Sequence, residues 1–235
     1  MATMIALSLP LLGAAAAVAV THTALGPDHT LPFVMLSRAR GWSRARTLAV
    51  TIVCGIAHVL SSVVLGMVGL AIGAGLGWFQ RAEGIRGDWA AWALVGLGAA
   101  YALWGVRRAL RRSSGLEPHA HEGHVHVHPG GTTHHHHPHH HDPSTFWALF
   151  IVFALGPCEP LLPLFLVPAS RGDWMLAGVT AAVFGLVTIV TMAVLVLAAH
   201  AGLERLPLGK LERWSHAAAG TVIAASGLAI LFLGL

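Results

Sequence analysis

The sequence predicts an all-α integral membrane protein of six transmembrane helices, arranged as two inverted repeats of three helices each. Two observations predict the membrane class: 55% of the 235 residues are hydrophobic and only 10% are charged, and the mean hydropathy is +0.69. A soluble domain of this length carries much more charge on its surface. A third observation, a proline-interrupted motif that occurs twice, predicts the repeats.

Six apolar stretches are long enough to cross a bilayer, which takes roughly 20 residues per helix. They cover residues 14–36, 48–73, 89–106, 146–168, 174–199 and 214–235. Residues 1–20 are as hydrophobic as a signal peptide but contain no basic residue, so we assign them to the first span. The chain then divides into a first repeat (1–112), a disordered histidine-rich loop (113–145) and a second repeat (146–235).

The basic residues gather on alternate connections, and this sets the expected topology. They follow the first, third and fifth spans, within residues 38–46, 107–112 and 205–213, whereas the other connections hold only Arg81, Arg86 and Arg171. The positive-inside rule places the three basic connections in the cytoplasm. We therefore expect a multi-pass protein of the cell (inner) membrane, with both termini on the non-cytoplasmic side and the histidine-rich loop in the cytoplasm.

The repeats rest on residues 24–32 (ALGPDHTLP) and 154–163 (ALGPCEPLLP), which lie 130 residues apart. The same offset places Gly55 on Gly185 and His58 on Thr188. Because each half holds three spans, the second half must cross the membrane in the opposite sense, as in transporters whose Gly/Pro-interrupted spans mark a midplane site. The alternative is a chance recurrence of a common tetrapeptide.

Several ionisable residues fall inside the predicted spans, where an Asp costs roughly 2.5 to 3.5 kcal/mol to insert and is therefore a functional candidate. Imidazole with carboxylate or thiolate suits nickel, cobalt and zinc better than calcium or magnesium. The candidate metal ligands are His22, Asp28, His29, His58, Cys158 and Glu159. The candidate path-lining residues are Ser61, Thr188 and Thr191.

These residues also have interpretations other than metal binding. His58 could serve as an interhelical hydrogen-bond partner, and Cys158 could pack as a small apolar residue. Asp28 and Glu159 could relay protons instead of binding metal. His200 and His216, at helix ends, fit interfacial positions better than a ligand set.

The loop between the repeats is rich in histidine, Gly and Pro and is not expected to fold alone. An expression tag would sit at a terminus, so we interpret the segment as native and able to collect metal through neutral imidazoles. Its candidate ligands are His119, His121, His124, His126, His128, His134, His135, His136, His137, His139, His140 and His141.

The pattern of His22, Asp28 and His29, followed by His58 and a histidine-rich loop, resembles the nickel/cobalt transporter superfamily. The six-span size and residues 156–160 are closest to its small urease-accessory nickel permeases. The resemblance implies transport of Ni²⁺ or Co²⁺, with Zn²⁺ possible, as cargo and not as a cofactor; it does not set the direction, for which we slightly favour uptake over efflux. It implies as partners the lipid bilayer, the metal ion and cytoplasmic metal chaperones of a nickel or cobalt enzyme.

Two other functions remain open. The run Gly156, Pro157, Cys158 is similar to the cysteine elements of small cytochrome c biogenesis proteins, which are membrane thiol–disulfide electron carriers with a cysteine in each repeat. Here Asp28 stands at the equivalent position, and the second cysteine is Cys54. An exporter of a small organic or inorganic anion would need a cation in its spans, and the predicted spans contain none. No motif predicts an enzyme or a nucleic-acid partner.

Overall fold

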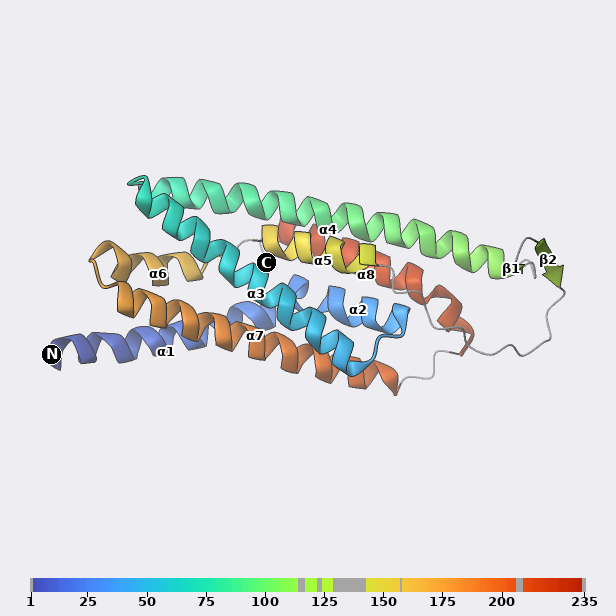
Figure 1. Cartoon of the computed structure of the whole chain (residues 1–235), viewed down its shortest axis with the longest axis horizontal. Helices are drawn as coiled ribbons and strands as arrows, with labels where there is room; N and C mark the ends of the chain where they lie inside the picture. The colour runs from blue at the N-terminus through green and yellow to red at the C-terminus, as the bar shows by residue number, and fades with distance from the viewer. Residues whose placement is uncertain are drawn as a thin grey trace.

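The computed structural model describes residues 2–113, 117–121, 124–128, 143–156, 158–205 and 209–233, and it is a helical bundle with one short pair of strands (Figure 1). Large hydrophobic side chains such as Leu60, Leu186 and Phe232 are exposed on its outside, as expected where lipid is the solvent. Five helical segments in the described residues are long and apolar enough to cross a membrane: Ser8–Leu25, Arg44–Ala71, Gly77–Arg111, Trp174–Glu204 and Glu212–Leu233. The chain is an integral multi-pass membrane protein.

The first predicted span is interrupted at its prolines. Helix α1 (Ala2–Leu25) ends where Gly26 adopts an extended conformation, with φ −74° and ψ 108°, before Pro27. A residue that precedes proline disfavours the helical conformation, which explains the break. A 3₁₀ turn, η1 (Pro27–His29), leads into α2 (Leu31–Arg40), which stops at Gly41 in the left-handed conformation with φ 61°.

Helices α3 and α4 complete the first half. Helix α3 (Arg44–Ala71) is capped by Ser43, whose Oγ accepts a hydrogen bond from the Arg46 amide at 3.3 Å. Helix α4 (Leu76–Ser113) begins well before residue 89, where the sequence predicted the third span to start. The prediction was wrong at this end because Arg81, Glu83, Arg86 and Asp88 lower the local hydropathy although they belong to the helix.

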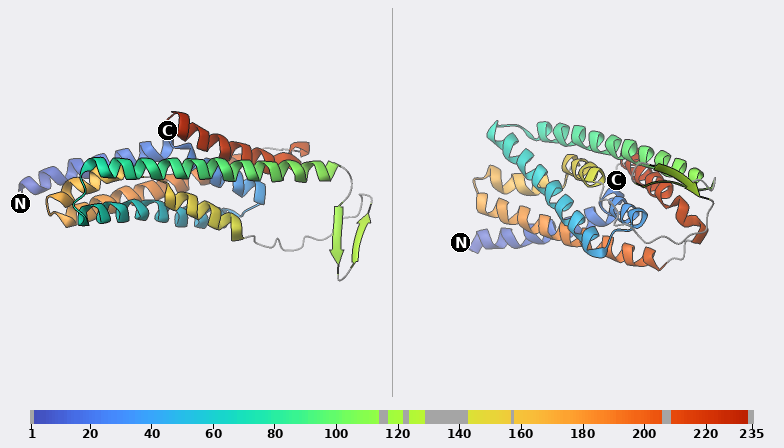
Figure 2. Two further views of the ribbon diagram at one scale, coloured as in Figure 1. Left: turned by 90° about the horizontal axis from the view of Figure 1, so that it is seen from above. Right: turned by 45° about the vertical axis from the view of Figure 1, so that its right-hand side comes forward.

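The histidine-rich segment contains an antiparallel pair of strands, β1 (Glu117–His121) and β2 (His124–His128), in which His119 faces His126 and His121 faces His124. The pair lies beyond the end of α4 (Figure 2). The sequence predicted no regular structure here. His134 to His137 and His139 to His141 lie outside the described residues.

The second half also contains a broken helix pair. Helix α5 (Pro143–Leu155) and helix α6 (Leu161–Ser170) are separated by residues 156–160, inside the stretch 146–168 that was predicted as one span with an interruption at Pro157. Pro157, the residue to which the break was assigned, lies outside the described residues. After a turn at Gly172 (φ 80°), α7 (Trp174–Glu204) is capped by Asp173, and η2 (Gly209–Trp214) leads into α8 (Ser215–Leu233).

Helix α4 packs along α8 (Figure 2), and small residues form the contact between them. A Cβ atom at Gly98 would overlap the backbone of Ala224, and one at Gly220 would overlap the backbone of Ala102. A Cβ at Gly227 would meet the backbone carbonyl of Ala91 at 2.7 Å. Glycine is therefore required for the two helix backbones to approach this closely, as in other membrane helix pairs.

Helix α3 crosses α7 through a matching pair of glycines. A Cβ atom at Gly55 would lie 3.1 Å from Ile189, and a Cβ at Gly185 would lie 2.8 Å from Val59. Helix α7 also packs against α1, while α3 packs against α5 and α6. These contacts bring both helix breaks to the middle of the bundle.

Candidate functional site

Three histidines from separate elements meet at the first helix break. His22 lies in the last turn of α1, His29 in η1 and His58 in the middle of α3. The ring centroids of His22 and His29 are 4.8 Å apart, and those of His29 and His58 are 5.1 Å apart. One possible ligand atom from each residue lies within 4.8 Å of the other two. The structure therefore brings together three of the six predicted metal ligands.

Hydrogen bonds orient two of these rings. His29 Nδ1 lies 2.9 Å from Asp28 Oδ1, and His58 Nδ1 lies 3.3 Å from the Phe153 carbonyl oxygen. If each Nδ1 carries the proton, each Nε2 presents a lone pair, which is the arrangement of metal-binding histidines held by a carboxylate or a carbonyl. The Nε2 atoms of His22, His29 and His58 are buried, and none has a hydrogen-bond partner among the described residues.

Gly26 makes the contact between Asp28 and His29 possible. A Cβ atom at position 26 would overlap the His29 ring and would lie 2.8 Å from Asp28 Oδ1. The backbone of Gly26 has a negative φ that any residue can adopt. The glycine is thus needed for space and not for its conformational freedom.

A cavity of about 500 Å³ joins the two helix breaks. Its lining includes all three histidines and Asp28 from the first break, and Gly156, Glu159 and Pro160 from the second. Asp88 of α4 also lines it. The cavity is therefore flanked by three carboxylates, Asp28, Asp88 and Glu159.

Cys158 lies in the second break and is fully buried. Its amide donates a hydrogen bond to Ser62 Oγ at 3.1 Å. Cys54 is also buried, and both thiols are free. Ser62 is eight residues beyond Cys54 on α3, which is about 12 Å along a helix, so the two cysteines are not placed to pair. Neither Cys158 nor Glu159 belongs to the three-histidine cluster within the described residues.

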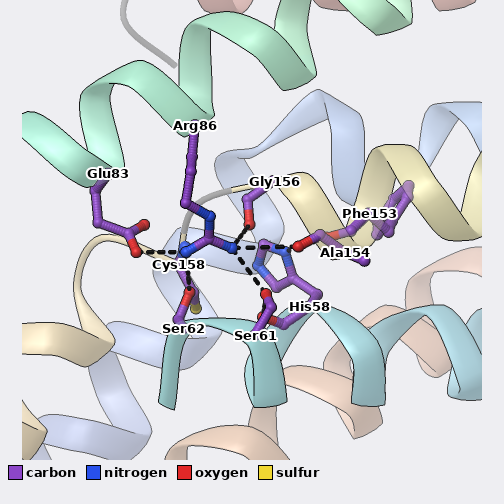
Figure 3. Close-up of polar contacts among 9 residues, drawn as sticks. All are labelled: His58, Ser61, Ser62, Glu83, Arg86, Phe153, Ala154, Gly156 and Cys158. Atoms are coloured by element: carbon purple, nitrogen blue, oxygen red, sulfur yellow. Dashed lines mark hydrogen bonds and ion pairs between the residues drawn. The ribbon is translucent and has the colours of Figure 1, made fainter. Parts of the chain in front are cut away.

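A buried ion pair, missed by the sequence analysis, holds the second break (Figure 3). Arg86 donates to Glu83 Oε1 at 2.6 Å, to Ser61 Oγ at 2.8 Å and to the carbonyl oxygens of Ala154 and Gly156 at 3.2 Å each. The Glu83 and Arg86 side chains are 3% and 18% exposed. Low local hydropathy placed Arg86 in a predicted connection, although its spacing of three residues from Glu83 fits one face of a helix.

A family model described as the transmembrane region of cytochrome c biogenesis proteins matches residues 28–234. The match covers most of the chain and includes both cysteines, the second helix break and the part of the first break from Asp28 onward. The chain belongs to this family. No curated protein and no solved structure matches the chain.

Membership of the cytochrome c biogenesis family corrects two predictions. The resemblance to the nickel/cobalt transporter superfamily was wrong, and so was the function drawn from it, transport of nickel or cobalt. The resemblance depended on a histidine pattern that starts at His22, whereas the family match starts at Asp28. Broken spans with polar residues are shared by several membrane architectures, so the pattern did not identify the family.

Three further predicted site residues, Ser61, Thr188 and Thr191, are not among the described residues that line the cavity, and their path-lining role stays a prediction. Ser61 donates to the His58 carbonyl oxygen at 2.8 Å and accepts from Arg86, so it links α3 to α4. Thr188 is buried on α7 and Thr191 is half-buried. Metal binding by the loop histidines stays a prediction.

His200 and His216 lie in separate networks. His200 Nδ1 is 2.9 Å from Ser37 Oγ, and its Nε2 is 3.2 Å from Glu204 Oε1. His216 Nδ1 is 2.8 Å from the Tyr101 hydroxyl. Both histidines connect helices instead of contributing to the three-histidine cluster.

Proposed function

We propose that this chain is a membrane electron carrier of the thiol–disulfide class that serves cytochrome c biogenesis, with Cys158 as its reactive thiol. The observation that carries the proposal is the position of Cys158, which lies inside the region that matches the family and in the helix break whose residues Gly156, Glu159 and Pro160 line the cavity. Unsatisfied backbone N–H and C=O groups are costly in lipid, so a helix break at membrane depth indicates a functional site. The chain is proposed as a carrier, and the net chemistry takes place on its partners.

A single thiol can pass electrons between two partners by exchange. The Cys158 thiolate attacks a disulfide of one partner, whose S–S bond breaks as a mixed disulfide forms, and the released sulfur takes up a proton. A thiolate of a dithiol protein on the other face then attacks the Cys158 sulfur and releases the first partner fully reduced, with a second proton. The second thiolate of the dithiol protein closes its own disulfide, and Cys158 leaves as the thiolate that began the cycle.

The exchange requires that the buried Cys158 become accessible from each face in turn. This requirement fits the finer fold that we propose: six crossings, with α1–η1–α2 and α5–α6 each forming one interrupted crossing, in two inverted repeats. The contacts support it. The Gly55 contact with Ile189 and the Gly185 contact with Val59 exchange under the offset of 130. On α4 and α8, an offset of 129 places Gly98 on Gly227 and Val95 on Ala224. It therefore converts the contact of Gly98 with Ala224 into the contact of Gly227 with Val95.

The proposed sidedness follows from the basic connections. Residues 38–46 and 107–112 face the cytoplasm, and so does the strand pair that follows α4, whereas both termini face the other side of the inner membrane. Cys158 would then alternate between a cytoplasmic dithiol protein and a disulfide protein on the other face.

The three-histidine cluster favours a second role at the same site, the binding of a resident transition-metal ion. Three buried Nε2 atoms without partners would leave polar groups unsatisfied, which is costly in a dry interior. Imidazole ligands suit first-row ions such as copper, iron, cobalt or zinc. His22, His29 and His58 would hold the ion, and Asp28 would orient His29 from outside the ligand set.

Electron transfer across a sealed membrane tests the main proposal. Liposomes would carry the full chain, reduced thioredoxin and its regenerating system inside, and a charged aromatic disulfide outside. We expect release of the coloured thiol outside the wild-type liposomes, its loss with Cys158→Ser and its retention with Cys54→Ser, the matched control. Transfer by Cys158→Ser at the wild-type rate would refute the proposed role.

A further inference from the structure

The buried ion pair of Glu83 and Arg86 makes more contacts than a salt bridge within one helix requires. The two residues are three apart on α4, and their side chains meet in the interior of the bundle. Charged groups inside a membrane domain are costly unless they pair, and they mark functional positions. Glu83 compensates the charge of Arg86, but four further contacts of Arg86 lie on other elements.

Those contacts converge on the second helix break (Figure 3). Arg86 donates to the carbonyl oxygens of Ala154 and Gly156. These carbonyls lie at the end of α5, where no following helical turn supplies amide donors. It also reaches Ser61 Oγ at 2.8 Å and Ser62 Oγ at 3.4 Å on α3. One guanidinium thus joins α3, α4 and the broken span.

Ser62 links this network to the thiol. Its Oγ accepts the hydrogen bond of the Cys158 amide while Arg86 contacts the same oxygen. Cys158 is held from both sides, through Gly156 two residues earlier and through Ser62.

We infer that Arg86 is the positioning residue of Cys158: it fixes the backbone that carries the thiol and places a positive charge beside the exchange site. The inference rests on the proposed function, in which Cys158 is the reactive thiol. A cation near a thiol favours the thiolate, which is the nucleophile in exchange. Arg is suited to this task because its planar fork can bond several acceptors at once.

The rate of alkylation of Cys158 tests this inference without any partner. The full chain carrying Cys54→Ser would react with N-ethylmaleimide between pH 6 and 9, followed by intact-mass measurement. At pH 7 we expect Arg86→Gln to slow labelling about tenfold and to move the pH profile to higher pH. We expect Arg86→Lys to recover part of the rate and Ser62→Ala to slow labelling less than Arg86→Gln. Arg81→Gln, at an exposed position of the same helix, is the matched control.

A structural role alone would give another pattern, because loosening the break exposes the thiol. Equal rates in wild type and Arg86→Gln at every pH, or faster labelling in both Arg86 variants, would overturn the inference. If Arg86→Gln does not fold, the Arg86→Lys and Ser62→Ala profiles decide: both must differ from wild type. The liposome experiment separates the two claims, since a loss of the alkylation effect leaves electron transfer through Cys158 intact.

Discussion

At the scale of single residues, the two helix breaks share a sequence motif but carry side chains of different chemistry. Asp28 and Cys158 occupy equivalent positions of the repeated motif, yet Asp28 contacts His29 at 2.9 Å and Cys158 is held by Ser62. The first break therefore presents imidazoles to the cavity, and the second carries a thiol. A chain with one cysteine per repeat could form an intramolecular disulfide between its breaks, whereas the exchange proposed for Cys158 uses the thiols of partner proteins.

Gly26→Ala tests whether the histidine cluster binds a metal ion. The added methyl group would displace the His29 ring from Asp28, and loss of such an orienting contact typically costs 10- to 100-fold in metal affinity. We expect at least a tenfold weaker affinity for Co²⁺, measured by visible absorption and equilibrium dialysis of the purified chain.

Gly13→Ala on α1, where an added Cβ meets nothing within 4 Å, is the control for the Gly26 experiment and should bind like wild type. Cobalt is a spectroscopic probe here and identifies no physiological ion. If both alanine variants bound Co²⁺ as tightly as wild type, the orienting role of Asp28 would be excluded.

At the scale of elements, hydropathy and proline spacing predicted most helices but not the start of α4. Apolar stretches predicted α3, α7 and α8 to within a few residues at most ends, because lipid demands a continuous apolar surface. The motif at residues 24–32 predicted the first break through Pro27. Hydropathy failed at Glu83 and Arg86, because a window average cannot tell a charge facing solvent from one that pairs inside the bundle.

The sequence predicted only part of the site, because it shows which residues are chemically unusual but not how the helices pack. Residue chemistry identified His22, His29 and His58, since ionisable side chains in apolar segments are rare. Their meeting depends on how α1, η1 and α3 pack, which no spacing in the sequence encodes. The Ser62 contact with Cys158 was also out of reach, since serine is common in membrane helices.

The glycine seam between α4 and α8 is tested by a pair of neighbouring positions. Gly98 faces the backbone of Ala224, whereas a Cβ at Gly96 would meet nothing within 4 Å. Gly98→Ala should destabilise the bundle by about 1 to 3 kcal/mol through overpacking. Gly96→Ala should leave stability unchanged or slightly higher, because alanine favours helix. Thermal unfolding in detergent measures both, and equal melting temperatures would show that the seam tolerates a methyl group.

At the scale of the whole molecule, the two helix breaks come together because each broken segment packs against a helix of the other half. Helix α7 packs against α1 and α2, and α3 packs against α5 and α6, so each broken segment lies beside a helix of the other half. Helices α3 and α7 also pack against each other, as do α4 and α8. Such swapping places both breaks around one cavity, and a rocking of one half against the other would expose it to each face in turn.

Sidedness of two corresponding turns tests the inverted arrangement. Ala45 follows the first interrupted crossing and Ser170 ends the second, and both are exposed. In the proposed arrangement of three crossings per repeat, equivalent turns lie on opposite faces of the membrane. In a chain without its native cysteines, we expect a membrane-impermeant maleimide to label Ala45→Cys only in inverted vesicles and Ser170→Cys only in right-side-out vesicles. Labelling of both positions from the same face would mean that the halves are parallel, and a thiol between them could not then be presented to opposite faces by the symmetric motion proposed here.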